Sequence, residues 1–135
     1  MDIARFEKVN EQYFAGLLGI KMLEITEDRL VARVEVRREL CNPGGVMHGG
    51  AIMAFADTLG AIATIANLQP GYNTTTIESK TNFLQAAKEG SVVIGECTPL
   101  HRGKRLMTWT TRVLNEDRSK LLAVVTQTQI VLEPR

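Results

Sequence analysis

Cysteine and histidine are scarce in this sequence, and each scarcity excludes a class of protein. The two cysteines, Cys41 and Cys97, cannot supply the disulfide framework of a small secreted domain. The two histidines, His48 and His101, lie far apart and do not show the spacing of zinc ligands. We therefore expect neither a disulfide-stabilised fold nor a metal site.

An excess of charge of one sign and a targeting segment are also lacking. The chain carries 16 Lys and Arg against 15 Asp and Glu, a formal net charge of +1, with no long block of like charge. This balance argues against nucleic acid as a partner. The start MDIARFEK lacks the apolar core of a signal peptide, so we expect a cytoplasmic protein. At 135 residues, the chain fits one domain spanning residues 1–135.

What the sequence does contain is an apolar segment, residues 49–68, directly after a loop of proline and glycine at residues 43–45. The segment has no proline, so we predict a long helix that begins near His48 or Gly49. Its only charged residue is Asp57. A carboxylate in such surroundings is paired, capped or functional.

The same segment has about the length of a membrane span. A central Asp costs roughly 2.5–3.5 kcal/mol on insertion scales, and flanking Lys or Arg anchors are missing. We therefore predict a helix that is buried inside protein, and no membrane partner.

The remaining chain predicts one more helix and six strands. Apolar residues recur at helical spacing from Phe6 to Leu18, with Asp2 as a cap and Gly19 as the stop. Alternating or β-branched runs predict strands at residues 20–26, 29–36, 74–84, 91–100, 106–114 and 121–132. This order predicts an α+β fold, an antiparallel sheet with a helix lying across it. Because the central helix is so poor in charge, we expect a second subunit to cover part of it.

The run HGGAIMAFADTLG, residues 48–60, resembles the hot-dog-fold acyl-CoA thioesterases. It is most similar to the PaaI-like branch, with its phenylacetate-pathway and enterobactin-proofreading enzymes. The pattern is an Asn, six residues to HGG, and then an acid. Here it is Asn42, His48-Gly49-Gly50 and Asp57, followed by the turn PLHRGK, residues 99–104. The resemblance implies a sheet wrapped around the central helix, paired into homodimers and commonly into tetramers as dimers of dimers.

The resemblance also implies roles for individual residues. Asp57 would attack the thioester carbonyl or activate water, and the Gly49 N–H would polarise the carbonyl oxygen. Asn42 and His48 would help to hold the thioester or the water. In several relatives a Ser or Thr one turn after the acid assists, but here that position is Ala61. The residue Thr76 lies near where another branch places a helper hydroxyl.

The substrate implied by the resemblance is an acyl-CoA, with an aromatic or a medium-chain acyl group. The hairpin with His101, Arg102, Gly103, Lys104 and Arg105 would lie near the CoA moiety, and its basic side chains suit phosphates. The same residues are equally consistent with a solvated hairpin. No metal or organic cofactor is needed, because a helix N-terminus and a base or nucleophile suffice for thioester hydrolysis.

Helix geometry makes a separate prediction about assembly. Gly49 and Asp57 are eight residues apart on one helix, roughly 12 Å along its axis, so both cannot touch one carbonyl. We therefore expect active sites that are shared between two chains. Other interpretations stay open: Asn42 as a plain Asn-Pro turn residue, Asp57 as an acid paired with a buried Arg, a hot-dog hydratase or dehydratase, and a non-catalytic acyl-CoA-binding protein.

Overall fold

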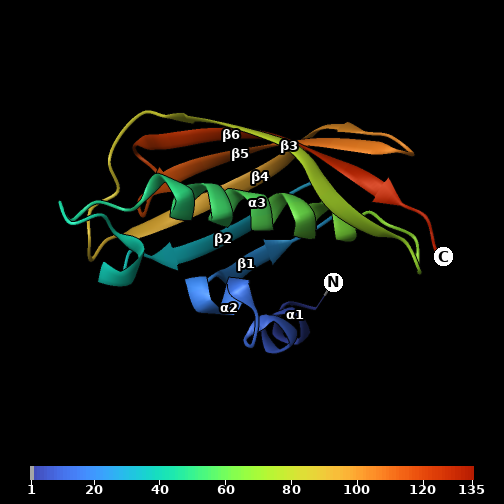
Figure 1. Ribbon diagram of the computed structural model, residues 1–135, viewed down its shortest axis with the longest axis horizontal. Helices are drawn as coiled ribbons and strands as arrows, with labels where there is room; N and C mark the ends of the chain where they lie inside the picture. The colour runs from blue at the N-terminus through green and yellow to red at the C-terminus, as the bar shows by residue number, and fades with distance from the viewer. Residues whose placement is uncertain (1) are drawn as a thin grey trace.

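One antiparallel sheet carries the fold. The computed structural model describes residues 2–135, and six strands form its sheet in the order β1-β2-β4-β5-β6-β3. The strands are β1 (Lys21–Ile25), β2 (Leu30–Glu35), β3 (Asn73–Phe83), β4 (Val92–Arg102), β5 (Leu106–Asn115) and β6 (Leu121–Leu132). Figure 1 shows the long helix α3 (Gly49–Ile65) lying across one face of this sheet. The predicted α+β fold is confirmed.

The helix α3 lies close to the sheet because apolar residues line the side that faces it. Phe55 and Leu59 are fully buried there. Below them β4 carries Gly95, where an added Cβ would lie 2.5 Å from Leu59 Cδ1 and 2.9 Å from Phe55 Cζ. A glycine at this position therefore sets the approach of helix to sheet. Within residues 2–135, no helix combines the length and the apolarity that crossing a membrane requires.

The prediction of a single N-terminal helix is wrong. The structure has two helices, α1 (Ile3–Asn10) and α2 (Phe14–Leu18), with a turn between them. The second helix folds back on the end of the first, and Gly16 permits this because a Cβ there would overlap the carbonyl groups of the turn. The two predicted ends are correct, since Asp2 caps α1 and Gly19 ends α2 with a φ of 77°.

Three larger differences from the sequence-based prediction remain, while most other strand ends agree to within about one residue. The helix α3 ends at Ile65, before the predicted residue 68. The strand β4 continues to Arg102, so that the hairpin to β5 is shorter than predicted. A turn of 3₁₀ helix, η1 (Arg38–Leu40), precedes the glycine-rich loop and was not predicted. None of these changes moves α3 relative to the sheet.

The two edges of the sheet differ. At the β1 edge, the Met22 N–H donates to Glu7 Oε1 of α1 at 3.0 Å, so a helix partly covers that strand. At the other edge, β3 pairs only with β6 among the described residues. Ile77 and Phe83 of β3 are 54% and 53% exposed. A long bare edge of this kind is where another chain can pair.

Candidate active site

The loop before α3 is held by backbone hydrogen bonds. The Gly45 N–H donates to Asn42 O at 2.9 Å, and the Asn42 N–H donates to Val46 O at 2.8 Å. The His48 N–H donates to Leu40 O at 2.8 Å, which fixes the point where α3 begins. Asn42 is therefore a turn residue by its backbone, while its exposed side chain is open to a ligand.

The imidazole of His48 folds back over the first turn of α3 and caps the helix. Its Nδ1 accepts a hydrogen bond from the Gly50 N–H at 2.8 Å. Because Nδ1 accepts, the neutral ring carries its hydrogen on Nε2, where it can donate to a substrate oxygen. An added Cβ on Gly50 would lie only 2.9 Å from His48 Nδ1. The second glycine of the motif therefore makes room for the imidazole.

The backbone N–H of Gly49 is the open donor of this helix turn. The Gly50 N–H is taken by His48 Nδ1, and the Ala51 N–H donates to His48 O at 2.9 Å. The Gly49 N–H has no hydrogen-bond partner among residues 2–135. An unpaired N–H at the positive end of a helix dipole suits a developing oxyanion. The ring of Phe83 lies beside this glycine, 3.1 Å from where a Cβ would stand.

The carboxylate of Asp57 is half-buried and accepts one strong hydrogen bond. Thr76 Oγ1 on β3 donates to Asp57 Oδ1 at 2.6 Å. The ion pairs among residues 2–135 do not include Asp57, so the alternative of an acid paired with a buried Arg is wrong. The structure thus brings together Asp57 and Thr76, which are two of the predicted site residues.

The two halves of the candidate site lie at different places on α3. His48 and Gly49 begin the helix, whereas Asp57 lies two turns further on. At 1.5 Å per residue, the separation of Gly49 and Asp57 along the axis is roughly 12 Å. A single chain therefore does not bring the open N–H and the carboxylate to one carbonyl carbon.

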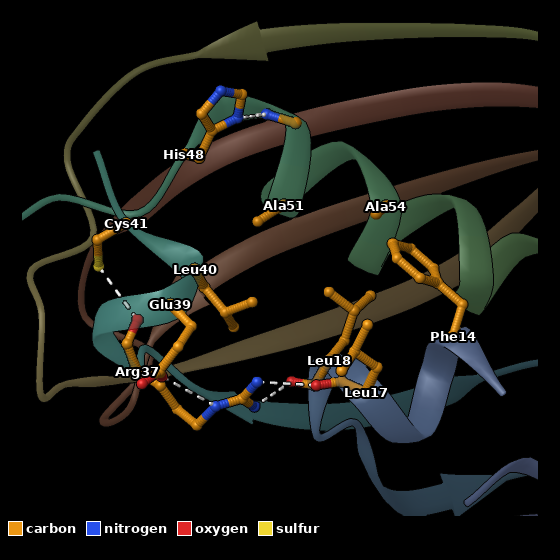
Figure 2. Close-up of a pocket in the computed structure, with 11 residues that line it drawn as sticks. Phe14, Leu17, Leu18, Arg37, Glu39, Leu40, Cys41, His48, Ala51 and Ala54 are labelled. Carbon is orange, nitrogen blue, oxygen red and sulfur yellow. Dashed lines mark hydrogen bonds and ion pairs between the residues drawn. The ribbon is translucent and has the colours of Figure 1, made fainter. Parts of the chain in front are cut away.

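A groove of about 510 Å³ lies between α2 and α3, with His48 at one end (Figure 2). Phe14 and Leu17 of α2 are 57% and 67% exposed, and they face the small residues Ala51 and Ala54 of α3. The groove is therefore apolar between α2 and the first turns of α3, with His48 at one end and the charged residues Arg37 and Glu39 also in its lining. This shape suits an apolar group attached to a polar reacting centre.

The guanidinium of Arg37 holds the end of α2 at this groove. It donates to Leu17 O at 2.8 Å and to Leu18 O at 3.1 Å, which caps the last carbonyl groups of the short helix (Figure 2). Arg37 therefore fixes the wall of the groove that carries Phe14 and Leu17.

Neither cysteine is suited to act as the nucleophile. Loss of solvent contact, together with the carboxylates of Glu89 and Glu39, raises the pKa of the Cys41 thiol at the groove. Burial raises the pKa of Cys97 to about 11. Both thiols therefore stay protonated near neutral pH, and the reactive form of a cysteine is the thiolate.

The basic hairpin lies far from the start of α3. A second groove, of about 500 Å³, places Gly103, Lys104 and Arg105 beside the segment that follows the helix, residues 67–72. Arg102 instead turns to Asp28, with Nη1 and Oδ1 2.8 Å apart, and also donates to Glu27 O. The structure therefore groups Lys104 with Arg105, while it engages Arg102 elsewhere.

Exposed His101 belongs to the same hairpin. An added Cβ on Gly103 would lie 2.7 Å from His101 Nε2, so the glycine makes room for this imidazole. The side chain of His101 thus lies against Gly103, in the hairpin that the second groove places beside residues 67–72, after the end of α3.

Sequence reasoning missed two residues that build the site, Gln127 and Gln129, and it gave Gly50 of the motif no role of its own. Gly50 makes room for His48, as described above. Gln129 Nε2 donates to Thr76 Oγ1 at 2.6 Å and to Gln127 Oε1 at 2.6 Å. The signal was present in the alternation Val125, Gln127, Gln129 on one face of a predicted strand, where polar residues interrupt an apolar row.

An antiparallel sheet wrapped on one long helix defines the hot-dog class of fold, and the comparisons with known proteins agree. A family model described as the thioesterase superfamily matches residues 44–122, more than half of the chain. The crystal structure of a thioesterase from Haemophilus influenzae superposes with a TM-score of 0.92 at 26% identity. That superposition covers 98% of this chain and 92% of that one. The chain therefore belongs to the thioesterase superfamily.

Two curated relatives carry related activities. A 1,4-dihydroxy-2-naphthoyl-CoA hydrolase of Escherichia coli strain K12 is 31% identical over 108 residues, which is 80% of this chain and 79% of that one. A proofreading thioesterase EntH of Cronobacter turicensis is 32% identical over 100 residues, 74% of this chain and 72% of that one. The predicted resemblance is confirmed, and the chain is a thioester hydrolase, which disfavours the hydratase and the non-catalytic alternatives.

Proposed function

We propose that the protein hydrolyses acyl-CoA to a free acid and CoA, with Asp57 as nucleophile or general base. The observation that carries this proposal is the open Gly49 N–H beside His48, the residue that caps α3. A carboxylate on the same helix has no counter-charge among the described residues, so that it is free to act on a substrate. The thioesterase family supports this chemistry, and the CoA-thioester relative supports the substrate class.

The proposed site is completed by a second copy of the chain. A two-fold dimer that joins two β3 edges would lay the two α3 helices side by side and antiparallel. The acid of one chain then approaches the first helix turn of the other, which removes the separation of roughly 12 Å within one chain. Each dimer has two equivalent sites, and two dimers could pair further as a tetramer.

In such a site the thioester carbonyl oxygen lies on the Gly49 N–H, with the His48 Nε2–H beside it. Asp57 of the partner subunit attacks the carbonyl carbon, or takes a proton from a water that attacks it. The carbonyl π electrons move to the oxygen, where the N–H groups stabilise the negative charge. The C–S bond then breaks and CoA leaves as a thiolate, a good leaving group with an ordinary thiol pKa near 8.5. In the general-base route, the acid is released at once, and the proton held by Asp57 passes to the thiolate. In the nucleophilic route, an anhydride joins the acyl group to Asp57, and water then hydrolyses it to the free acid and the carboxylate.

The two ends of the substrate fit the two grooves. The apolar groove begins at His48 and runs between α2 and α3, so it suits an aromatic or medium-chain acyl group. The hairpin groove carries Lys104 and Arg105 without ion pairs among residues 2–135, so it suits the phosphates of CoA. Antiparallel helices would bring the hairpin of the partner toward the first turn of α3.

A panel of aromatic, short-chain and medium-chain acyl-CoAs, assayed by thiol release, tests the function. Asp57→Asn should lower kcat by roughly 10²–10⁴ with an unchanged fold, the usual worth of a base or nucleophile. Asp117→Asn, in the turn between β5 and β6, is the matched control and should keep full activity. Full turnover by Asp57→Asn would make Asp57 a structural residue. No thiol release from any CoA ester would refute the substrate class.

A further inference from the structure

Two glutamines lie between α3 and the sheet, in a row that is otherwise apolar. The residues of β6 on that face are Ala123, Val125, Gln127, Gln129 and Val131. Gln127 and Gln129 are both fully buried. An amide buried without partners costs about 1–3 kcal/mol, so a polar pair in this row requires a matching network.

The direction of the hydrogen bonds follows from one backbone carbonyl. Gln127 Nε2 donates to Ala56 O of α3 at 2.8 Å. Because a carbonyl only accepts, this bond fixes which end of the Gln127 amide is nitrogen and turns Oε1 toward Gln129. Gln129 must then present its nitrogen, which donates to Gln127 Oε1 and to Thr76 Oγ1, each at 2.6 Å.

The hydroxyl of Thr76 is thereby given one direction. Its oxygen accepts from Gln129, so its single hydrogen goes to Asp57 Oδ1, 2.6 Å away. The oxygen of the Gln129 amide, Oε1, lies 3.1 Å from Thr74 Oγ1, whose single hydrogen it shares with Ile130 O at 2.9 Å. Both hydrogens of the Gln129 amide nitrogen are used. The hydrogen bonds thus run from the glutamines through Thr76 to the carboxylate, and they leave Asp57 Oδ2 uninvolved.

A glycine in the middle of α3 accommodates this network. An added Cβ on Gly60 would overlap the amide group of Gln127. Glycine inside a helix is less favourable than alanine by roughly 1 kcal/mol. The helix thus has a residue of low helix propensity, Gly60, at the position where the Gln127 side chain packs.

On their inner faces, β3 and its neighbour β6 carry no titratable group beside Asp57. On β3, Ser79 pairs with Gln127 and shares the inner face with Thr76. Glu78 pairs with Thr128, which donates to it on the outer face of the sheet, and Lys80 alternates with Ser79. The hydrogen bond from Thr76 is therefore the main polar influence that these strands exert on the carboxylate.

We propose that Gln127 and Gln129 are positioning residues, which lock the Thr76 hydroxyl onto Asp57 Oδ1 and so reserve Oδ2 for the thioester or the attacking water. The proposal rests on the function proposed above. It also supplies a hydroxyl for the acid from β3, in place of the residue that is Ala61 here.

The test is the pH profile of kcat for Gln129→Met, Gln129→Glu and Thr76→Val. Each variant weakens a bond that favours the ionised carboxylate. In Thr76→Val the acid side of the kcat profile should differ from wild type, because the hydrogen bond from residue 76 to the carboxylate is lost. Gln129→Met frees the hydroxyl to rotate and should move the profile less. Gln129→Glu draws the hydroxyl toward itself and adds a second carboxylate, so it should move the profile most.

Matched variants separate positioning from structural damage. Thr76→Ser keeps the hydroxyl and should keep the wild-type profile. Thr128→Val changes the outer face of β6, the strand that carries Gln129, and should also keep the wild-type profile. Gln129→Met in a Thr76→Val background should add nothing to the shift, because both variants break one chain of bonds. An unchanged profile in Gln129→Met, or shifts that add in the double variant, would overturn the proposal.

A measurement without substrate keeps the two proposals distinguishable. The ¹³C signal of the Asp57 carboxyl, assigned by its loss in Asp57→Asn, reports the ionisation of the group directly. Its titration should move to higher pH in Thr76→Val and not in Thr76→Ser, whether or not any CoA ester is hydrolysed. If Gln129→Met fails to fold, Gly60→Ala perturbs the network from the helix side, because its Cβ displaces the Gln127 amide to which Gln129 donates. Equal titrations in Gly60→Ala and wild type would then count against the network.

Discussion

His48 Nδ1 and the backbone nitrogen of Gly50 lie 2.8 Å apart, and this bond gives the two glycines after His48 different roles. Gly50 offers its N–H to the imidazole and has no side chain to push the ring away. Gly49 keeps its own N–H open among the described residues. The His48-Gly49-Gly50 motif thus caps α3 with the His48 side chain and leaves the Gly49 N–H free among the described residues.

A methyl group at residue 50 tests this device. In Gly50→Ala the new Cβ would stand 2.9 Å from His48 Nδ1, so the imidazole should leave its position. We expect kcat to fall by at least about tenfold, the equivalent of about 1.4 kcal/mol of lost stabilisation. Thermal stability should change little, since alanine improves helix propensity by up to about 1 kcal/mol while the cap loses a similar amount.

The matched control for this variant is Gly44→Ala in the preceding loop. No heavy atom lies within 4 Å of a Cβ added there. Gly44→Ala should therefore keep wild-type activity. If both variants lost activity equally, general loop sensitivity would explain the result better than displacement of His48.

The sequence predicts the framework of the fold well, because periodic apolar residues dominate it. The central helix and the six strands follow from spacing alone, and Asp57 stands out as the only charge in residues 49–68. The break between α1 and α2 escapes such reasoning. Apolar spacing continues across residues 11–13, and only the contact of Gly16 with the preceding turn shows that the chain folds back.

The partners of the site residues cannot be derived from spacing, since they come from distant strands. Thr76 reaches Asp57 from β3, and Gln129 reaches Thr76 from β6. In the hairpin of residues 101–105 as well, contacts with distant segments cannot be derived from the sequence. Arg102 looks equivalent to Lys104 and Arg105 in the sequence, but its ion pair with Asp28 depends on where the turn after β1 lies.

The free cations of the hairpin predict a selective effect on CoA esters. Replacing Lys104 and Arg105 with Ala should raise KM for acyl-CoA and leave kcat nearly unchanged, because remote phosphates contribute mainly uniform binding. Truncated pantetheine thioesters should not respond. The control is Arg5→Ala with Lys8→Ala on α1, which removes the same charge elsewhere. An equal loss on both substrates would place the hairpin outside the nucleotide site.

Burial of Cys97 predicts a loss of stability at alkaline pH. Its folded pKa is raised to about 11, from an ordinary value near 8.5. Below pH 8 both states keep the proton, so this group adds no pH dependence. Between about pH 8.5 and 11 only the unfolded state releases it, and the free energy of unfolding should fall, by about 1–2 kcal/mol at pH 10.

Denaturant unfolding of wild type and Cys97→Ala between pH 8 and pH 10.5 measures this contribution. The cavity left by the substitution lowers stability at every pH, so the difference between the two proteins should narrow as the pH rises. Val113→Ala, another fully buried truncation, should keep a constant difference from wild type. A constant difference for Cys97→Ala as well would mean that its thiol ionises alike in both states.

The shared active site predicts complementation between two inactive chains. Homodimers of His48→Ala and of Asp57→Asn should each be nearly inactive. In the mixed dimer, one site would combine His48 of the Asp57→Asn chain with Asp57 of the His48→Ala chain, so it would be intact. The other site would contain both substitutions. An isolated heterodimer should therefore recover about half of the wild-type rate, if the two sites act independently. Sites formed within single chains would leave both damaged and the heterodimer inactive.

The reciprocal pairing gives the opposite result and guards against exchange or refolding artefacts. When a wild-type chain pairs with a chain that carries both His48→Ala and Asp57→Asn, each shared site receives one lesion. This heterodimer should be nearly inactive, whereas sites formed within single chains would leave it half active. Wild-type dimers taken through the same isolation must keep their rate. The shared site would be refuted if the heterodimer of wild type and double variant were active and the heterodimer of the two single variants were not. Each active site would then use Gly49 and Asp57 of one chain, despite the roughly 12 Å between them along α3.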